Sequence, residues 1–161
     1  MPLPILLIAP ETTAIPVSNS LRQELDAVVE ISANRRSGLA SLRRGEYSLV
    51  LLDESIAAAD SETTDMIYQS ANAAPVLEIN FAIAGVPRIV RQVRAALNRR
   101  AHDQAQARMA AAAALQSELN ASLTGLLLES QLALREATPE QAPKLRHVIE
   151  LAGDLRNRLR I

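Results

Sequence analysis

The chain has 161 residues, is 48% hydrophobic but only 2% aromatic, and carries a formal net charge of −1. This length suits one domain or a small domain with an appendage, and the near-zero charge argues against nucleic acid or an anionic membrane as a partner. Cysteine is absent, which excludes disulfides and thiolate chemistry and fits a reducing compartment, so we expect a cytoplasmic protein.

Strand and helix patterns alternate through the first half of the chain. Residues 4–9 and 48–52 form continuous apolar runs, which are typical of strands covered on both faces, and 5–9 is too short for a signal peptide or a membrane span. This alternation predicts an α/β fold with a parallel sheet and helices on both faces. The other expected elements are strands over 28–31 and 75–80, and helices over 19–26 (capped by Ser18), around Leu39 and Leu42 as far as Gly45, and over 61–71.

From Pro87 onward the sequence shows helical patterns only. Helix formers run from Pro87 to Glu136, which predicts one helix of about 50 residues and about 75 Å, with a break over 98–106 as the alternative. The segment 138–141 (TPEQ) resembles a capping box and predicts the start of a final helix, unless Pro143 sets that start. We therefore expect an α/β domain over 1–100 and a C-terminal helical hairpin over 101–161.

Both arms of the hairpin carry apolar residues at three-to-four spacing. Two antiparallel helices cover only part of two such stripes, so we expect a second copy to complete a four-helix bundle in a homodimer. The alternative is that the hairpin folds back on the α/β domain. The residues expected at the dimer interface are Leu115, Leu119, Leu123, Leu126, Leu145, Val148, Ile149, Ala152, Leu155 and Leu159.

The runs ILLIA (5–9), SLVLLD (48–53) and PVLEIN (75–80), followed by IVRQVRAALNRR (89–100), resemble a response-regulator receiver domain. The segment between Asn80 and Pro87 is too short for that family's fourth helix and fifth strand, so the resemblance implies a shortened receiver. It makes Asp53 the phosphoacceptor candidate, and Glu11 and Asp53 the candidate metal ligands. The family's lysine has no counterpart, because Lys144 is the only lysine in the chain. Asp53 would otherwise cap the turn after its strand.

The segment SELNASLTG (117–125) resembles the dimerisation and phosphotransfer hairpin of histidine kinases. Ser117 stands where that family has its phosphoacceptor histidine, and Ser122 stands where it has a proline. The resemblance therefore implies the dimer-building part of such a hairpin without its chemistry.

Together the two resemblances imply a protein that is not an enzyme, with no catalytic residues. They imply a two-component signalling adaptor or scaffold that dimerises through its hairpin and modulates a phosphorelay, with a histidine kinase or a response regulator as partner. No cofactor is expected, apart from Mg²⁺ if Asp53 is phosphorylated. The order of parts is also similar to that of receiver-like RNA-binding transcription antiterminators, which is the alternative function.

Overall fold

The computed structural model describes residues 3–159 of the chain. It is an α/β protein with a parallel sheet and a C-terminal helical hairpin, as the sequence predicts. The elements in chain order are β1 (Leu3–Ile8), α1 (Glu11–Leu25), β2 (Ala27–Ser32), α2 (Arg35–Arg44), β3 (Leu49–Asp53), α3 (Glu54–Ala57), α4 (Ser61–Ser70), β4 (Val76–Ile79), α5 (Val86–Glu136) and α6 (Ala142–Leu159).

The four strands form one parallel sheet in the order β2-β1-β3-β4. This order matches the first four strands of the flavodoxin-like arrangement 2-1-3-4-5, which receivers share. Only a turn separates β4 from α5. Strand β4 is therefore an edge strand of this sheet, whereas in the flavodoxin-like arrangement a fifth strand lies beside it. Residues 80–85 contain neither a helix nor a strand, as the sequence predicts.

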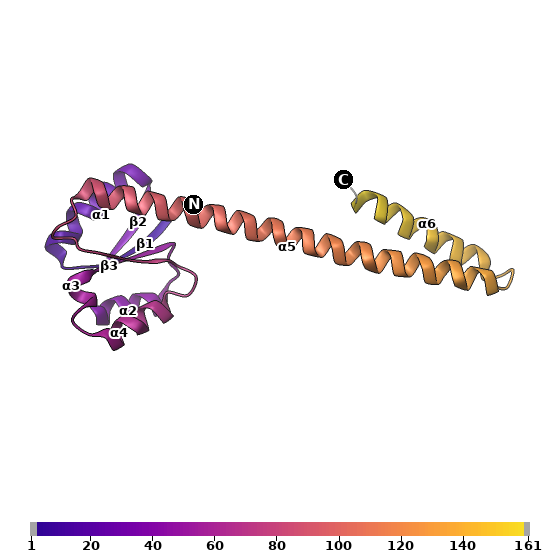
Figure 1. Ribbon diagram of the computed structural model, residues 1–161, viewed down its shortest axis with the longest axis horizontal. Coiled ribbons are helices and arrows are strands. Elements are labelled where there is room, and N and C mark those ends of the chain that lie inside the picture. Colours follow the sequence, from indigo (N-terminus) through magenta and orange to yellow (C-terminus); the bar gives the residue numbers. More distant parts are fainter. Residues whose placement is uncertain (1–2, 160–161) are drawn as a thin grey trace. The chain divides into compact units, whose positions relative to one another are not determined.

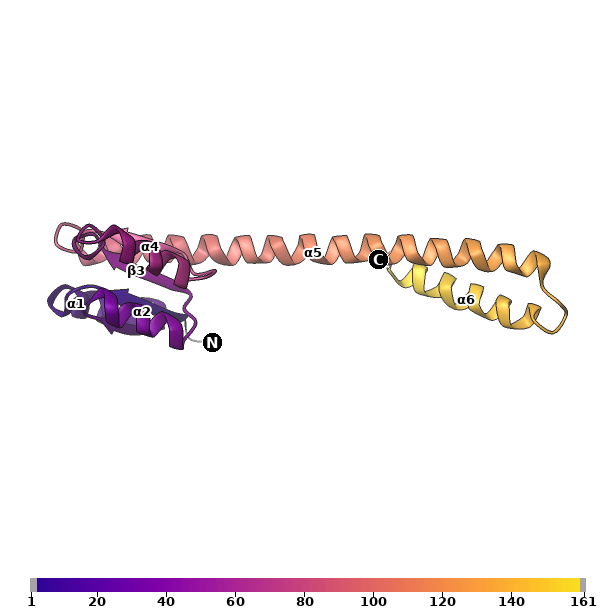
Figure 2. The same cartoon turned by 90° about the horizontal axis from the view of Figure 1, so that it is seen from below.

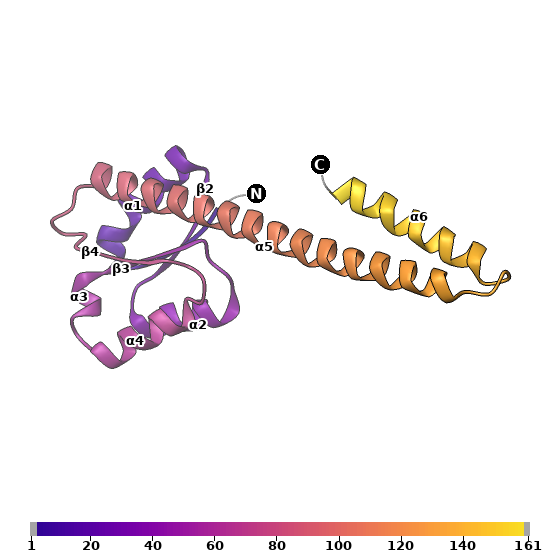
Figure 3. The same cartoon turned by 45° about the vertical axis from the view of Figure 1, so that its right-hand side comes forward.

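The central strands β1 and β3 are buried on both faces, which explains their uninterrupted apolar sequences. Ile5 and Leu7 of β1 face the layer formed by α1 and the start of α5, whereas Leu6 and Ile8 face α2 and α4. Figures 1 and 3 show these two helical layers on opposite sides of the sheet. The short helix α3, which the sequence did not predict, follows β3 directly.

Helix α1 begins at Glu11, eight residues before the start expected from the sequence. Ser18 is therefore not a cap, because it lies inside the helix and is buried. Pro16 also lies inside α1, where it removes a hydrogen bond to the carbonyl of Thr12. Thr12 and Pro16 are both exposed, so water can satisfy the carbonyl of Thr12. The apolar stripe that begins at Ala14 sets the true start of the helix.

The chain divides into two compact units, Met1–Asp103 and Gln104–Ile161, a boundary three residues beyond the expected one. Helix α5 is one uninterrupted helix of 51 residues that contributes to both units, so the alternative of a break over 98–106 is wrong. Helix α6 begins at Ala142 with Pro143 as its second residue. One half of the expected capping box forms just before it, where the N–H of Thr138 donates to Oε1 of Gln141 at 3.4 Å. Figure 2 shows α6 lying along the last part of α5.

Candidate functional site

The carboxyl ends of β1, β3 and β4 bring together the polar residues that the receiver resemblance singles out. In open α/β sheets this edge is where ligands usually bind. Glu11 is the first residue of α1 and is exposed, while Asp53 ends β3 and is only 5% exposed. A cavity of about 240 Å³ lies nearby and is lined by Glu54, Asn80 and Arg88 among others.

Asp53 acts as the N-cap of α3. Its Oδ1 accepts a hydrogen bond from the backbone N–H of Ser55 at 2.8 Å and another from the Ser55 hydroxyl. One carboxylate oxygen is therefore committed to holding the β3–α3 turn, as the sequence-based alternative for this residue proposed. Asn80 likewise serves its own turn, because its Oδ1 accepts from the N–H of Ile83 at 3.2 Å.

Glu11 and Asp53 are not joined by further ligands. Within residues 3–159, no group of three or more His, Cys, Asp or Glu side chains is placed to hold a metal ion. The two candidate ligands therefore remain a prediction from the resemblance.

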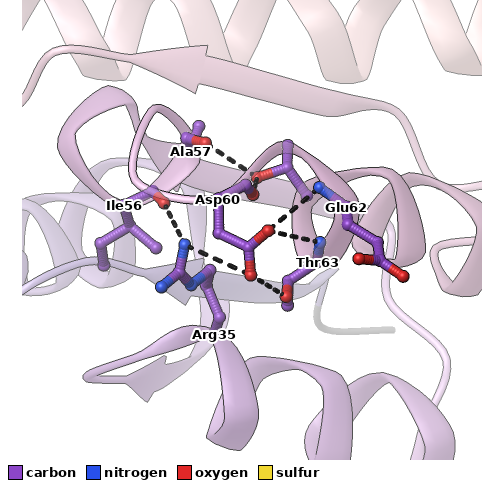
Figure 4. Close-up of polar contacts among 7 residues, drawn as sticks. Arg35, Ile56, Ala57, Asp60, Glu62 and Thr63 are labelled. Atoms are coloured by element: carbon purple, nitrogen blue, oxygen red, sulfur yellow. Dashed lines mark hydrogen bonds and ion pairs between the residues drawn. The ribbon is translucent and has the colours of Figure 1, made fainter.

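A second polar cluster, centred on Asp60, was not predicted from the sequence (Figure 4). Asp60 caps α4 by accepting from the N–H of Glu62 at 3.1 Å and of Thr63 at 3.4 Å, and from the Thr63 hydroxyl. Arg35 of α2 approaches the Asp60 carboxylate to 4.0 Å and donates to the carbonyl of Ile56 at 3.4 Å. The cluster joins α2, α3 and α4, which is a structural role.

The hydrogen bonds from Thr63, with a smaller contribution from the charge of Arg35, hold the pKa of Asp60 below its usual range. The signal for this cap is present in the sequence, because aspartate is a preferred N-cap residue and Asp60 directly precedes the predicted helix 61–71.

The hairpin leaves most of the expected interface leucines uncovered within one chain. Leu115 is 60% exposed, and Leu119 and Leu155 are about half exposed, as is the unpredicted Leu151. Of the other expected residues, Ala152 is already buried inside the hairpin, Leu126 is exposed, and the half-buried ones are Leu123, Leu145, Val148, Ile149 and Leu159.

On α5, three of the exposed leucines form a stripe of their own, whereas Leu128 and Leu132 are exposed on other sides of the helix. At about 100° per residue, Leu115, Leu119 and Leu126 fall within about 40° of one another. Their mean direction lies about 80° around α5 from the side, marked by Leu123 and Leu127, that packs toward α6.

A similar stripe runs along α6. Leu151 and Leu155 lie about 80–90° around that helix from its packed side, which is centred near Ala152. On both helices the exposed stripe is rotated from the packed side in the same direction when each helix is viewed from its N-terminus. Because the two helices are antiparallel, the two stripes therefore lie on the same side of the hairpin. We call these five residues the leucine face: Leu115, Leu119, Leu126, Leu151 and Leu155.

Comparison with known protein families, curated proteins and solved structures finds no match to this chain. Across residues 3–159, no helix is long and apolar enough to cross a membrane. Among the described residues, the leucine face is the largest group of exposed leucines on one side of the hairpin.

Proposed function

We propose that this protein is a non-catalytic adaptor of two-component signalling that pairs with a second copy through its hairpin and modulates a phosphorelay. The observation that carries the proposal is the leucine face. Each helix of a four-helix bundle contacts two neighbours at roughly right angles. The angular offset between the packed side and the exposed stripe, about 80–90° on both helices, is the offset that such a bundle requires.

The magnitudes are consistent with a reversible dimer. Completing the burial of a half-exposed leucine contributes about 1 kcal/mol, so the ten leucines of two faces contribute about 10 kcal/mol. Association costs about 4–15 kcal/mol in lost translational and rotational freedom. The half-buried residues beside the face, such as Leu123 and Val148, supply the margin.

The signalling part of the proposal is supported by the α/β unit. The strand order and the aspartate at the end of β3 are those of a receiver, whereas no lysine lies before Lys144. Phosphoryl transfer depends on charge stabilisation, and a domain without that cation suits recognition better than catalysis. An aspartate whose carboxylate already caps α3 points the same way.

The dimer is tested by sedimentation equilibrium over a wide concentration range. Wild-type protein should reach twice the chain mass of 17.4 kDa, and Leu119→Glu and Leu155→Glu should remain monomeric because each places a charge in the bundle core. Leu128→Glu is the matched control, since Leu128 is 59% exposed on the opposite side of α5. A monomeric wild type at all concentrations would disprove the pairing.

The adaptor role is tested on a purified kinase and response regulator from the same organism. The protein should change the rate of phosphotransfer between them, and Leu119→Glu should abolish that change. In parallel, acetyl phosphate with Mg²⁺ should add no mass at Asp53. A phosphorylated Asp53 would contradict the non-catalytic assignment and make the protein an active receiver.

A further inference from the structure

The outer edge of β4 carries unused hydrogen-bonding groups. The carbonyl of Pro75 accepts from the N–H of Val50 at 3.0 Å. Since backbone groups alternate in direction along a strand, those of Leu77 also point toward β3, whereas those of Val76 and Glu78 point outward. Among residues 3–159, the backbone hydrogen bonds outside the helices and strand ladders include none from Val76 or Glu78.

Two cavities lie beside this edge, one on each face of the sheet. On the α5 side a cavity of about 250 Å³ is lined mainly by the apolar residues Leu77, Ile79, Ala95 and Ala96, together with Glu78, Gln92 and Arg99. An added strand would project alternate side chains into this cavity and into its counterpart on the other face. The edge therefore offers both elements of strand recognition, a free backbone ladder and side-chain pockets.

The cavity on the α4 side is acidic. It measures about 400 Å³, and its charged lining residues are Glu54, Asp65 and Glu78. The Tyr68 hydroxyl donates to Glu78 at 2.6 Å and so orients that carboxylate at the edge. Alternate residues of an added strand would meet these carboxylates, which favour Lys or Arg.

The same charges argue against a second copy of this chain at the edge. If two copies of β4 paired antiparallel about a two-fold axis perpendicular to the sheet, the α4 sides of both copies would lie on the same face of the joined sheet. The carboxylates of Glu54, Asp65 and Glu78 from both copies would then share that face, and like charges across paired strands are destabilising. The occupant is therefore a different protein.

We propose that β4 binds an extended segment of a partner protein by strand addition, with apolar residues toward α5 and basic residues toward α4. This inference goes beyond the adaptor function and does not depend on hairpin pairing. The segment occupies the position where the doubly wound arrangement places its fifth strand.

The test uses the full chain and the peptide acetyl-Val-Arg-Val-Arg-Val-amide at low salt, followed by calorimetry and by amide NMR shifts. The peptide should bind and shift Val76, Glu78 and Ala95. Its analogue with Glu in place of Arg should bind more weakly. Absence of binding, or equal binding of both peptides, would overturn the proposal.

Two protein variants locate the site. Val76→Pro removes an outward N–H without touching the ladder to β3 and should weaken binding by about fivefold to tenfold. Asp65→Asn should weaken it by about twofold to fivefold, whereas Glu62→Gln, an exposed carboxylate on the same helix but outside the cavity lining, should not.

Two further outcomes would count against the proposal. Peptide affinity unchanged by Val76→Pro would place the peptide elsewhere. A wild-type solution mass that falls in Val76→Pro would assign the edge to a second copy of the chain. The leucine-face variants should bind the peptide normally, so failure of the dimer and failure of this site are distinguishable.

Discussion

Close packing between α2 and β1 depends on a single glycine. A Cβ at Gly38 would lie 2.6 Å from Cδ1 and 2.9 Å from Cγ1 of Ile8, which is fully buried. Alanine is favoured over glycine in a helix by about 0.5–1 kcal/mol, but overpacking a core costs about 1–3 kcal/mol. The steric term is the larger one at this position.

We therefore expect Gly38→Ala to lower the free energy of unfolding of the α/β unit by about 1 kcal/mol, measured by urea denaturation. Gly125→Ala is the control, because nothing lies within 4 Å of a Cβ built there. That variant should stabilise the hairpin by about 0.5–1 kcal/mol. Stabilisation by both substitutions would show that Ile8 moves freely.

The capping role of Asp53 predicts different effects for two substitutions. Asp53→Ala removes the acceptor of the Ser55 N–H and should cost about 1 kcal/mol of stability. Asp53→Asn retains a capping oxygen and should cost less. Urea denaturation of both variants checks this order, and equal losses would mean that the negative charge, rather than the hydrogen bond, matters at this position.

The lowered pKa of Asp60 predicts part of the loss of protein stability in acid. A carboxyl whose pKa in the folded state lies below its unfolded value of 3.8 contributes stability above that pH, and the contribution is lost as the pH falls through the folded pKa. Asp60→Asn should therefore reduce the fall in melting temperature between about pH 4 and about pH 2. Asp65→Asn, an exposed carboxyl on the same helix, should leave that fall unchanged.

At the scale of elements, the middle of α5 differs from its two ends. Residues 101–119 all have exposed side chains, whereas Val93 before them and Leu127 after them are buried. Helices without tertiary packing are marginal in water. The alanines of 110–114 therefore hold this stretch mainly through their high helix propensity.

We expect amide hydrogens of 101–114 to exchange faster than those of 123–134, measured by hydrogen–deuterium exchange. Replacing Ala112 and Ala113 with glycine should raise exchange in the first segment by about tenfold or more. The melting temperature of the α/β unit should not change. Equal protection of the two segments would indicate that another surface covers the middle of α5.

Sequence patterns predicted the strands better than the helix starts. The apolar runs of β1 and β3 predict doubly buried strands, because a strand covered on both faces carries apolar residues at every position. Helix α1 begins eight residues before its predicted start, because packing from Ala14 onward overrides the local cost of Pro16. Tertiary contacts decide such positions, and a local pattern does not contain them.

The leucine stripes show a second limit of sequence analysis. Periodicity identifies the apolar residues of α5 and α6. On each helix, however, the packed side and the exposed stripe are only about 80° apart, so a heptad pattern shows them as one broad apolar face. Only the placement of α6 against α5 separates Leu123, which is half buried, from Leu119, which is exposed. For the same reason the predicted interface does not include Leu151.

At the scale of the whole molecule, the two units have separate cores and should unfold separately. The α/β transition should not depend on protein concentration. The hairpin transition should move to higher temperature as concentration rises, because dimerisation stabilises the folded state by mass action. Differential scanning calorimetry checks this, with Leu119→Glu as the variant whose hairpin transition should be independent of concentration.

The only aromatic residues of the chain are Tyr47, Tyr68 and Phe81, all of which precede α5. Each tyrosine hydroxyl donates to a carboxylate, that of Tyr47 to Glu30 and that of Tyr68 to Glu78, and burial with these bonds raises both pKa values to about 12. Tyrosine emission therefore reports on the sheet domain alone, whereas far-ultraviolet ellipticity reports on the helices of both units. Comparison of the two signals in one unlabelled sample thus separates unfolding of the sheet domain from unfolding of the hairpin.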